Sequence, residues 1–197
     1  YNEVSYSSFT GKYGVGSIIN DNRDVVQVNY NKIHHNYFAN RTFVGSYPDE
    51  YNDQDAIRIG NSSSSLSNSY TEVYDNLFEN FFGEIEIISN KSCYNKYYNN
   101  TFRNYSDSLT LRHGNNCDVY NNYFFANNNQ FSGGIRVIGE NHKVYNNYIE
   151  GVNSTKSSAA GGGTSDNLGG INIIKGKSTS VNGSDLSGYY QVKSATI

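Results

Sequence analysis

The chain has 197 residues, of which 36% are hydrophobic and 17% charged, and its formal net charge is −3. The small charge excludes typical disorder, which pairs low hydrophobicity with high net charge, and a general attraction to nucleic acid. No run of about 18 apolar residues exists, so we do not expect a membrane-spanning segment. We therefore expect neither a membrane nor, given the small net charge, a nucleic acid as partner.

Aromatic and turn-forming residues dominate the composition. With 19 Tyr, 10 Phe, 19 Gly and one Pro, the sequence is typical of an all-β protein with many turns, because aromatic residues favour strands and Gly accepts turn conformations. The chain begins at Tyr1 without Met, and both of its ends resemble strands. We therefore expect residues 1–197 to form one domain that is an internal piece of a longer chain.

Two short strand patterns alternate along the chain. In the first, an Asn is followed by any residue and then by an aromatic or aliphatic one; it begins at Asn36, Asn76, Asn100, Asn122 and Asn147. In the second, apolar residues take the second and fourth of five places; it covers residues 56–60, 84–88, 108–112, 134–138 and 170–174. Alternation with a period of two predicts strands with one buried face.

From Asn76 to Asn147 the first pattern repeats every 22–25 residues, a period typical of solenoids. The gap of 40 residues from Asn36 to Asn76 contains a loop-like stretch at residues 41–55. A single coil cannot bury its apolar face alone, so coils stack on one another. A β-sandwich is the competing fold, because it also has short strands and frequent turns, but two-residue hairpin turns are not systematic here. The predicted fold class is all-β, a single-stranded parallel β-helix.

Matching places of successive coils stack about 4.8 Å apart in a parallel β-helix, so the second pattern can be aligned into columns. Two columns are expected to point inward: Ile57, Ile85, Leu109, Ile135 and Ile171, and Ile59, Ile87, Leu111, Val137 and Ile173. Between them, the outward column is Arg58, Glu86, Thr110, Arg136 and Asn172. The recurring Asn residues are expected to form a hydrogen-bonded ladder at a turn.

The cysteines and three of the histidines give weaker signals. Cys93 and Cys117 fall on adjacent predicted coils, where a disulfide and two buried free thiols are both compatible with the spacing. His34, His35 and His142 lack metal-ligand spacing, and we expect them in turns or on the surface.

Charged side chains gather on the predicted outward face. Glu84 and Glu86 are two residues apart and point the same way, so their repulsion favours a bound cation. Carboxylate and amide oxygens suit calcium, and Asn52, one coil earlier, is placed to add a ligand. Basic residues follow on the same face at Lys91, Arg112, His113 and Arg136. The alternative is a solvated ladder of ion pairs.

Three segments carry a family resemblance: GEIEIISNKS at residues 83–92, NTFR at 100–103 and LTLRHG at 109–114. Further matches lie at residues 8–12, 35–38, 57–60, 134–140 and 190–193. In this order the segments resemble polysaccharide lyase family six, which contains alginate lyases and the dermatan-cleaving chondroitinase B. The resemblance covers nearly the whole chain and implies a right-handed parallel β-helix.

The resemblance also implies roles for single residues. Lys91 matches the catalytic base of the family, and Arg112 matches its proposed catalytic acid. His113 and Arg136 match substrate-contacting positions, and Arg58 is expected to bind a substrate carboxylate, which a guanidinium fork suits.

The metal ligands implied by the resemblance are Glu84 and Glu86, which match calcium ligands, and Asn52 as a third. At the third position the family pattern is Asn-Gly-x-Glu, whereas this chain has Asn-Asp-Gln-Asp at residues 52–55. Asp55 is therefore the alternative third ligand.

The expected activity is calcium-assisted β-elimination from an anionic polysaccharide, with alginate favoured. A lysine can remove the C5 proton of a uronate if neighbouring positive charge lowers its pKa. A guanidinium is a poor acid, so the alternative is that Arg112 stabilises charge while water or a tyrosine supplies the proton. The alternatives are dermatan or chondroitin sulfate as substrate, or a carbohydrate-binding β-helix without catalysis. A polymeric substrate implies a secreted, extracellular or periplasmic location.

Overall fold

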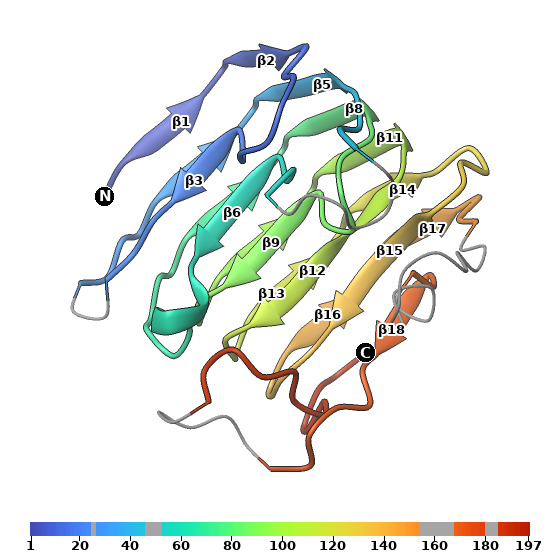
Figure 1. Cartoon of the computed structure of the whole chain (residues 1–197). Coiled ribbons are helices and arrows are strands. Elements are labelled where there is room, and N and C mark those ends of the chain that lie inside the picture. Colours follow the sequence, from blue (N-terminus) through green and yellow to red (C-terminus); the bar gives the residue numbers. More distant parts are fainter. Residues whose placement is uncertain (25–26, 46–52, 154–167, 180–184) are drawn as a thin grey trace.

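The structure is a computed structural model that describes residues 1–24, 27–45, 53–153, 168–179 and 185–197. Its strands form three parallel sheets of six strands each, and the chain visits the sheets in turn, so that each coil adds one strand to each sheet (Figure 1). The predicted all-β parallel β-helix is confirmed, and the sandwich alternative is wrong. Among the described residues, no helix is long and apolar enough to cross a membrane.

The strands are short, and a 3-10 turn, η1 (Ser62–Ser64), interrupts the second coil. Sheet A consists of β1 (Glu3–Ser5), β4 (Lys32–His34), β7 (Glu72–Tyr74), β10 (Lys96–Tyr98), β13 (Asp118–Tyr120) and β16 (Lys143–Tyr145). Sheet B consists of β2 (Ser8–Thr10), β5 (Tyr37–Arg41), β8 (Leu77–Phe81), β11 (Thr101–Tyr105), β14 (Tyr123–Phe125) and β17 (Tyr148–Glu150). Sheet C consists of β3 (Ile19–Asp21), β6 (Ile57–Gly60), β9 (Ile88–Lys91), β12 (Asp107–His113), β15 (Ser132–Val137) and β18 (Ile171–Ile173).

The core is built from side chains of like kind stacked along the axis. On sheet B the rings of five phenylalanines lie nearly face to face, with neighbouring centroids 4.5 to 5.1 Å apart. They are Phe9, Phe38, Phe78, Phe102 and Phe124. Since the coil spacing sets the ring spacing, each coil adds one ring to a continuous apolar column.

The register of sheet C differs from the predicted one in the third coil. Ile88 pairs with both Ile57 and Leu109, where we expected Ile85. Ile85 and Ile87 are nevertheless buried, because residues 82–87 form an irregular segment that packs inward before β9 begins. Alternation alone misplaced the strand, since apolar residues at 85, 87 and 88 fit two registers.

This shift changes the outward column of sheet C. Arg58 pairs with Ser89, and Glu86 lies outside the ladder. Lys91 instead ends β9, opposite Gly60 on one side and His113 on the other. At the last described strand, Ile171 and Ile173 are 40% and 60% exposed, because β18 pairs on one side only.

The predicted asparagine ladder is confirmed at the turn between sheets A and B. Asn76 donates from its backbone and side-chain nitrogens to Oδ1 of Asn100, at 3.1 and 3.0 Å. Asn36, Asn122 and Asn147 repeat this contact along the stack. Each ladder residue follows one with a positive φ, near +54°, at positions 35, 75, 99, 121 and 146. This left-handed residue turns the chain while the next Asn pairs the backbone groups of the corner.

Cys93 and Cys117 are buried free thiols. Their sulfurs accept or donate weak hydrogen bonds to backbone groups of residues 65, 92 and 115. The thiol alternative is therefore correct, and the disulfide alternative is wrong.

Asn100→Ala tests the ladder. The change leaves the backbone N–H of Asn76 without a partner in a buried corner and removes the side-chain bond to the carbonyl of Val73, so we expect the free energy of unfolding to fall by about 3 kcal/mol. Asn2→Ala removes a similar bond to Asn31 at an exposed position and should cost less than about 0.5 kcal/mol. Equal losses in denaturant unfolding would show that burial does not decide the ladder's contribution.

His142 makes folding stability depend on pH. It is fully buried, accepts at Nδ1 from the backbone N–H of Cys117, and bonds through Nε2 to Ile138 O; the expected surface location is wrong. Burial lowers its pKa from 6.5 to about 4. Between these pH values the unfolded chain binds a proton at His142 that the folded chain does not bind. The contribution of neutral, buried His142 to the free energy of unfolding is therefore present above pH 6.5 and is lost as the pH falls toward 4.

We expect His142→Gln to flatten the pH dependence of unfolding in that window by about one proton, or about 1.4 kcal/mol per pH unit. Denaturant midpoints measured across the window check this. An unchanged slope would mean that His142 is not the group responsible.

Candidate active site

The charged residues predicted from sequence come together on sheet C. Arg58, Lys91, Arg112 and Arg136 belong to β6, β9, β12 and β15, which are neighbours in that order. Because parallel strands advance by one coil at a time, these residues lie about 4.8 Å apart along the axis, although they are 21 to 33 positions apart in sequence. The expected clustering is therefore correct.

Glu86 is the centre of this cluster. Its Oε1 accepts hydrogen bonds from Nη1 of Arg136 at 3.3 Å and from Nη1 of Arg112 at 3.5 Å. The Glu86 side chain is 1% exposed. The Nε atoms of both arginines are buried and have no hydrogen-bond partner within the described residues. One carboxylate thus holds two guanidiniums. The Arg112 side chain is 26% exposed and the Arg136 side chain 6%, so Arg112 is the more accessible of the two to an anionic ligand.

Glu84 is buried beside a second group of acids. Its Oε1 accepts from the backbone N–H groups of Asp53 at 2.9 Å and Gln54 at 3.3 Å, but its Oε2 has no partner among the described residues. Burial, followed by the charges of Glu86 and Asp55, raises the pKa of Glu84 from 4.5 to about 9. An acid in this state favours a proton or a cation next to it.

Arg58 is bound by acids of its own coil. It pairs with Asp53, and with Oδ2 of Asp55 at 3.2 Å; Ser17 Oγ also donates to that oxygen at 2.6 Å. These contacts occupy part of the guanidinium that we expected to bind substrate. Asn52, the expected third calcium ligand, lies outside the described residues.

Two of the buried acids offer part of a metal site. Glu84 and Glu86 offer two buried carboxylates, and one oxygen lacks a partner, which fits a hard cation that takes oxygen ligands. Within the described part of the chain, no three His, Cys, Asp or Glu side chains converge as a complete metal site. A cation would therefore need amide, carbonyl or water oxygens in addition to this pair.

Lys91 stands next to these charges with its ammonium unpaired. It is half-buried, and no hydrogen bond or ion pair joins it to another described residue. Burial, followed by the charges of Arg112 and Arg58, lowers its pKa below 10.5, against the opposing effect of Glu86 and Asp55. More of this lysine is therefore neutral near pH 7 than of a surface lysine, as a proton-abstracting amine requires.

Two glycines fix the backbone at Lys91. A Cβ added to Gly60 would lie 2.4 Å from the carbonyl oxygen of Lys91, and one added to Gly114 would lie 2.3 Å from that of Ser92. Both glycines also have positive φ, 86° and 87°, which favours Gly over other residues. The coil before thus lies in close contact with the backbone of Lys91, and the coil after with the backbone of Ser92.

Tyr189 is a member of the site that sequence reasoning missed. Its ring centre lies 5.4 Å from Cζ of Arg112 and 5.5 Å from Cζ of Arg136, and the ring stacks on His113 at 6.0 Å. His113 is buried, and burial together with Arg112 and Lys91 lowers its pKa to about 4. Tyr189 lies outside the strand repeat, so no column predicted its position.

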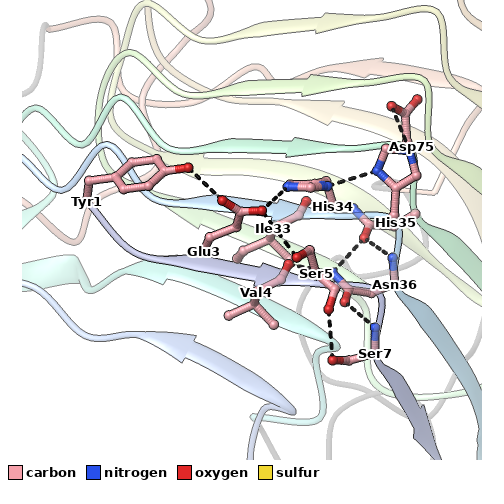
Figure 2. A network of polar contacts seen from close by, with 11 residues as sticks. Tyr1, Glu3, Val4, Ser5, Ser7, Ile33, His34, His35, Asn36 and Asp75 are labelled. Atoms are coloured by element: carbon pink, nitrogen blue, oxygen red, sulfur yellow. Dashed lines mark hydrogen bonds and ion pairs between the residues drawn. The ribbon is translucent and has the colours of Figure 1, made fainter.

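A second polar network lies on sheet A, apart from this cluster. Figure 2 shows Glu3 joined to Tyr1 and to His34, whose Nδ1 is 2.8 Å from Nδ1 of His35. His35 reaches Asp75 at 3.8 Å. His35 lies in a turn as expected, but the surface expectation for His34 is wrong, because it is 7% exposed.

Fold and site together define a β-helix that carries acid–base groups and unpaired basic donors on one sheet, an arrangement suited to anionic polysaccharides. The family model of chondroitinase B matches residues 1–162, so the chain belongs to that family, polysaccharide lyase family six. A comparison with curated proteins found no match.

Solved structures agree with this assignment. A family-six alginate lyase in complex with a trisaccharide is 30% identical, with a TM-score of 0.85 over 99% of this chain and 42% of that one. The alginate lyase AlyGC is 36% identical, with a TM-score of 0.82 over 99% and 24%. A mannuronic acid-specific family-six lyase from human gut microbiota is 30% identical, with a TM-score of 0.80 over 98% and 40%. The chain thus spans less than half the length of these relatives.

Glu84→Gln tests the buried acid. In metal-free protein, the folded state keeps a proton on Glu84 that the unfolded state releases, so this stability is present below pH 4.5 and is lost as the pH rises toward 9. We expect the variant to unfold at higher denaturant than wild type at about pH 8, by roughly 1–3 kcal/mol, and to match it at about pH 5. Glu150→Gln, at an exposed position, is the control and should leave the free energy of unfolding unchanged at both pH values. Equal stability of the Glu84 variant and wild type at both pH values would contradict the raised pKa.

Proposed function

We propose that this chain is the catalytic part of a polysaccharide lyase that cleaves alginate by β-elimination. The observation that carries the proposal is Lys91, a half-buried amine that has no partner in the described part of the chain and has a lowered pKa. It lies beside two arginines that share one carboxylate. A solvated ladder of ion pairs would instead pair the lysine with an acid. Membership of the lyase family supports the same conclusion.

The chemistry assigns a task to each group. Neutral Lys91 removes the C5 proton of a uronate bound across sheet C, and the electrons of that bond form the C4–C5 double bond. The C4–oxygen bond breaks, and the leaving oxygen takes a proton. Arg112 and Arg136 bind carboxylates and stabilise negative charge as it develops on the substrate.

Calcium is the proposed cofactor. Glu84 and Glu86 would hold it, with Asn52 or Asp55 as a further ligand. When bound, the ion neutralises the substrate carboxylate and so makes the neighbouring C5 proton more acidic.

Alginate is favoured as substrate because the similar solved structures include alginate lyases and a mannuronic acid-specific lyase. Dermatan sulfate is the second candidate, since the matching family model is chondroitinase B. Either polymer is too large to enter a cell intact, so we propose a secreted or periplasmic location.

Lys91→Ala in the full-length protein tests the proposal. Turnover is followed through the ultraviolet absorbance of the unsaturated uronate, first with alginate and then with dermatan sulfate, with calcium and with a chelator. We expect wild type to act on alginate and Lys91→Ala to be slower by about 100-fold or more, because it lacks the base. Lys96→Ala, which replaces an exposed lysine on sheet A, should keep full activity.

A different result contradicts each part of the proposal. Activity on dermatan sulfate alone would overturn the substrate, and full activity in chelator would overturn the role of calcium. No product from either polymer with a folded protein would favour a binding β-helix without catalysis.

A further inference from the structure

The second coil differs from the later coils where sheet A ends and the corner begins. At these two places the later coils have a Tyr followed by Asn or Asp: Tyr74 and Asp75, Tyr98 and Asn99, Tyr120 and Asn121, Tyr145 and Asn146. The second coil has His34 and His35 instead. Because Tyr and Asn form this corner in other coils, the fold alone does not require two histidines here.

The backbone brings the two imidazole rings together. Consecutive residues of a strand point to opposite faces, but His35 has a φ of 53°, and this left-handed turn places its ring beside that of His34. Nδ1 of His34 lies 2.8 Å from Nδ1 of His35 (Figure 2). The ring of His34 stacks on Tyr74 with centroids 4.6 Å apart, and that of His35 on Tyr6 at 5.0 Å. Two ring nitrogens thus converge on rings that aromatic contacts hold in place.

Carboxylates face the other nitrogen of each ring. Nε2 of His34 is 3.0 Å from Oε1 of Glu3, and Nε2 of His35 is 3.8 Å from Oδ2 of Asp75. Hydrogen bonds from Tyr1 and then from His34 lower the pKa of Glu3, so this carboxylate is ionised near pH 7 and can only accept. Nε2 of His34 therefore carries a proton, and Nδ1 of the neutral ring is a bare acceptor.

This arrangement leaves the pair with one acceptor too many. If His35 directs its own N–H toward Asp75, two nitrogen lone pairs face each other at 2.8 Å. If His35 instead donates through Nδ1, its bare Nε2 faces the Asp75 carboxylate. A cation bound by both Nδ1 atoms removes the conflict, and carboxylates at the far nitrogens are the usual partners of metal-binding histidines.

The distance between the two nitrogens indicates which kind of ion fits. With metal–imidazole bonds of about 2.0–2.1 Å, two tetrahedral zinc ligands lie about 3.3–3.4 Å apart. The observed 2.8 Å corresponds to roughly a right angle at the ion, which suits the square-planar geometry of copper(II). The His35 side chain is 43% exposed and lines an open hollow with Tyr6 and Tyr37, so water can supply the remaining ligands.

We propose that His34 and His35 form a copper(II) site, with Glu3 and Asp75 orienting the two rings. Both neutral rings bind the ion through Nδ1, and water completes its coordination. Glu3, the histidine pair and Asp75 belong to three successive coils. An ion that binds only the folded arrangement therefore stabilises this end of the β-helix. The site lies on sheet A and is independent of the proposed lyase function.

The repeat supplies the substitutions for the test. His34→Tyr and His35→Asn introduce the residues that later coils have at the same places, so both variants should fold. Copper(II) is titrated into the full-length protein, without a histidine tag, against a chelator of known affinity. We expect electron paramagnetic resonance to show two imidazole nitrogens in wild type. We expect both variants to lose this signal and to bind at least about tenfold more weakly.

Glu3→Gln tests the orientation of His34 and should weaken copper(II) binding by about 10- to 100-fold. Glu72→Gln is the matched control on the same sheet. Glu72 accepts from the hydroxyl of Tyr98 as Glu3 accepts from that of Tyr1, but no described contact joins it to a histidine. Its substitution should leave the affinity for copper(II) unchanged.

Thermal unfolding gives a second measurement. Copper(II) should raise the unfolding temperature of wild type more than that of His35→Asn. Equal copper(II) binding by wild type and both histidine variants would overturn the site and show that the pair shares a proton only. Tighter binding of zinc than of copper(II) at this pair would overturn the right-angle geometry and, with it, the assignment to copper(II).

Discussion

Hydrogen bonds between identical asparagines on successive coils set the position of everything else in this β-helix. The bonds repeat at the corner between sheets A and B, from Asn36 to Asn147, and a coil shifted by one residue would leave several buried amides unpaired. Sheet C lies on the same coils, so its register is fixed at a distance by this corner. Lys91 lies within electrostatic range of Arg112 and Glu86 because the corner keeps three coils in step.

The site differs from an ordinary charged surface in how little water reaches it. Asp55, Glu84, Glu86 and Arg136 are all at least 95% buried, and burial of unpaired charge is unfavourable. The cluster persists because opposite charges offset one another around Glu86. An anionic sugar bound at the two arginines would therefore meet groups that are already oriented and partly dehydrated, which is the condition for strong electrostatic stabilisation.

Sequence periodicity was sufficient for the fold class and for placing charged residues together on one sheet, because each repeat carries its own strand and turn signals. It failed in the third coil, where Ile85, Ile87 and Ile88 fit two registers and only packing against neighbouring coils decides between them. It also failed for His142, whose burial depends on backbone partners at residues 117 and 138. Tyr189 could not be located because it belongs to a non-repeating segment. Motif similarity, rather than periodicity, singled out Lys91 from the other lysines.

Gly60 and Gly114, which lie against the backbone of Lys91 and Ser92, also limit which substitutions this fold accepts. With Gly60 and Gly114 in van der Waals contact with the strand between them, the depth of the lysine in its sheet is a property of three coils together. A change of substrate preference by moving this backbone would require coordinated replacements in all three. Variation is far easier in segments such as the one that carries Tyr189, which cross the sheet edge without being part of the ladder. Within such a scaffold, the backbone at Lys91 is the fixed part and the non-repeating segments are the adjustable part.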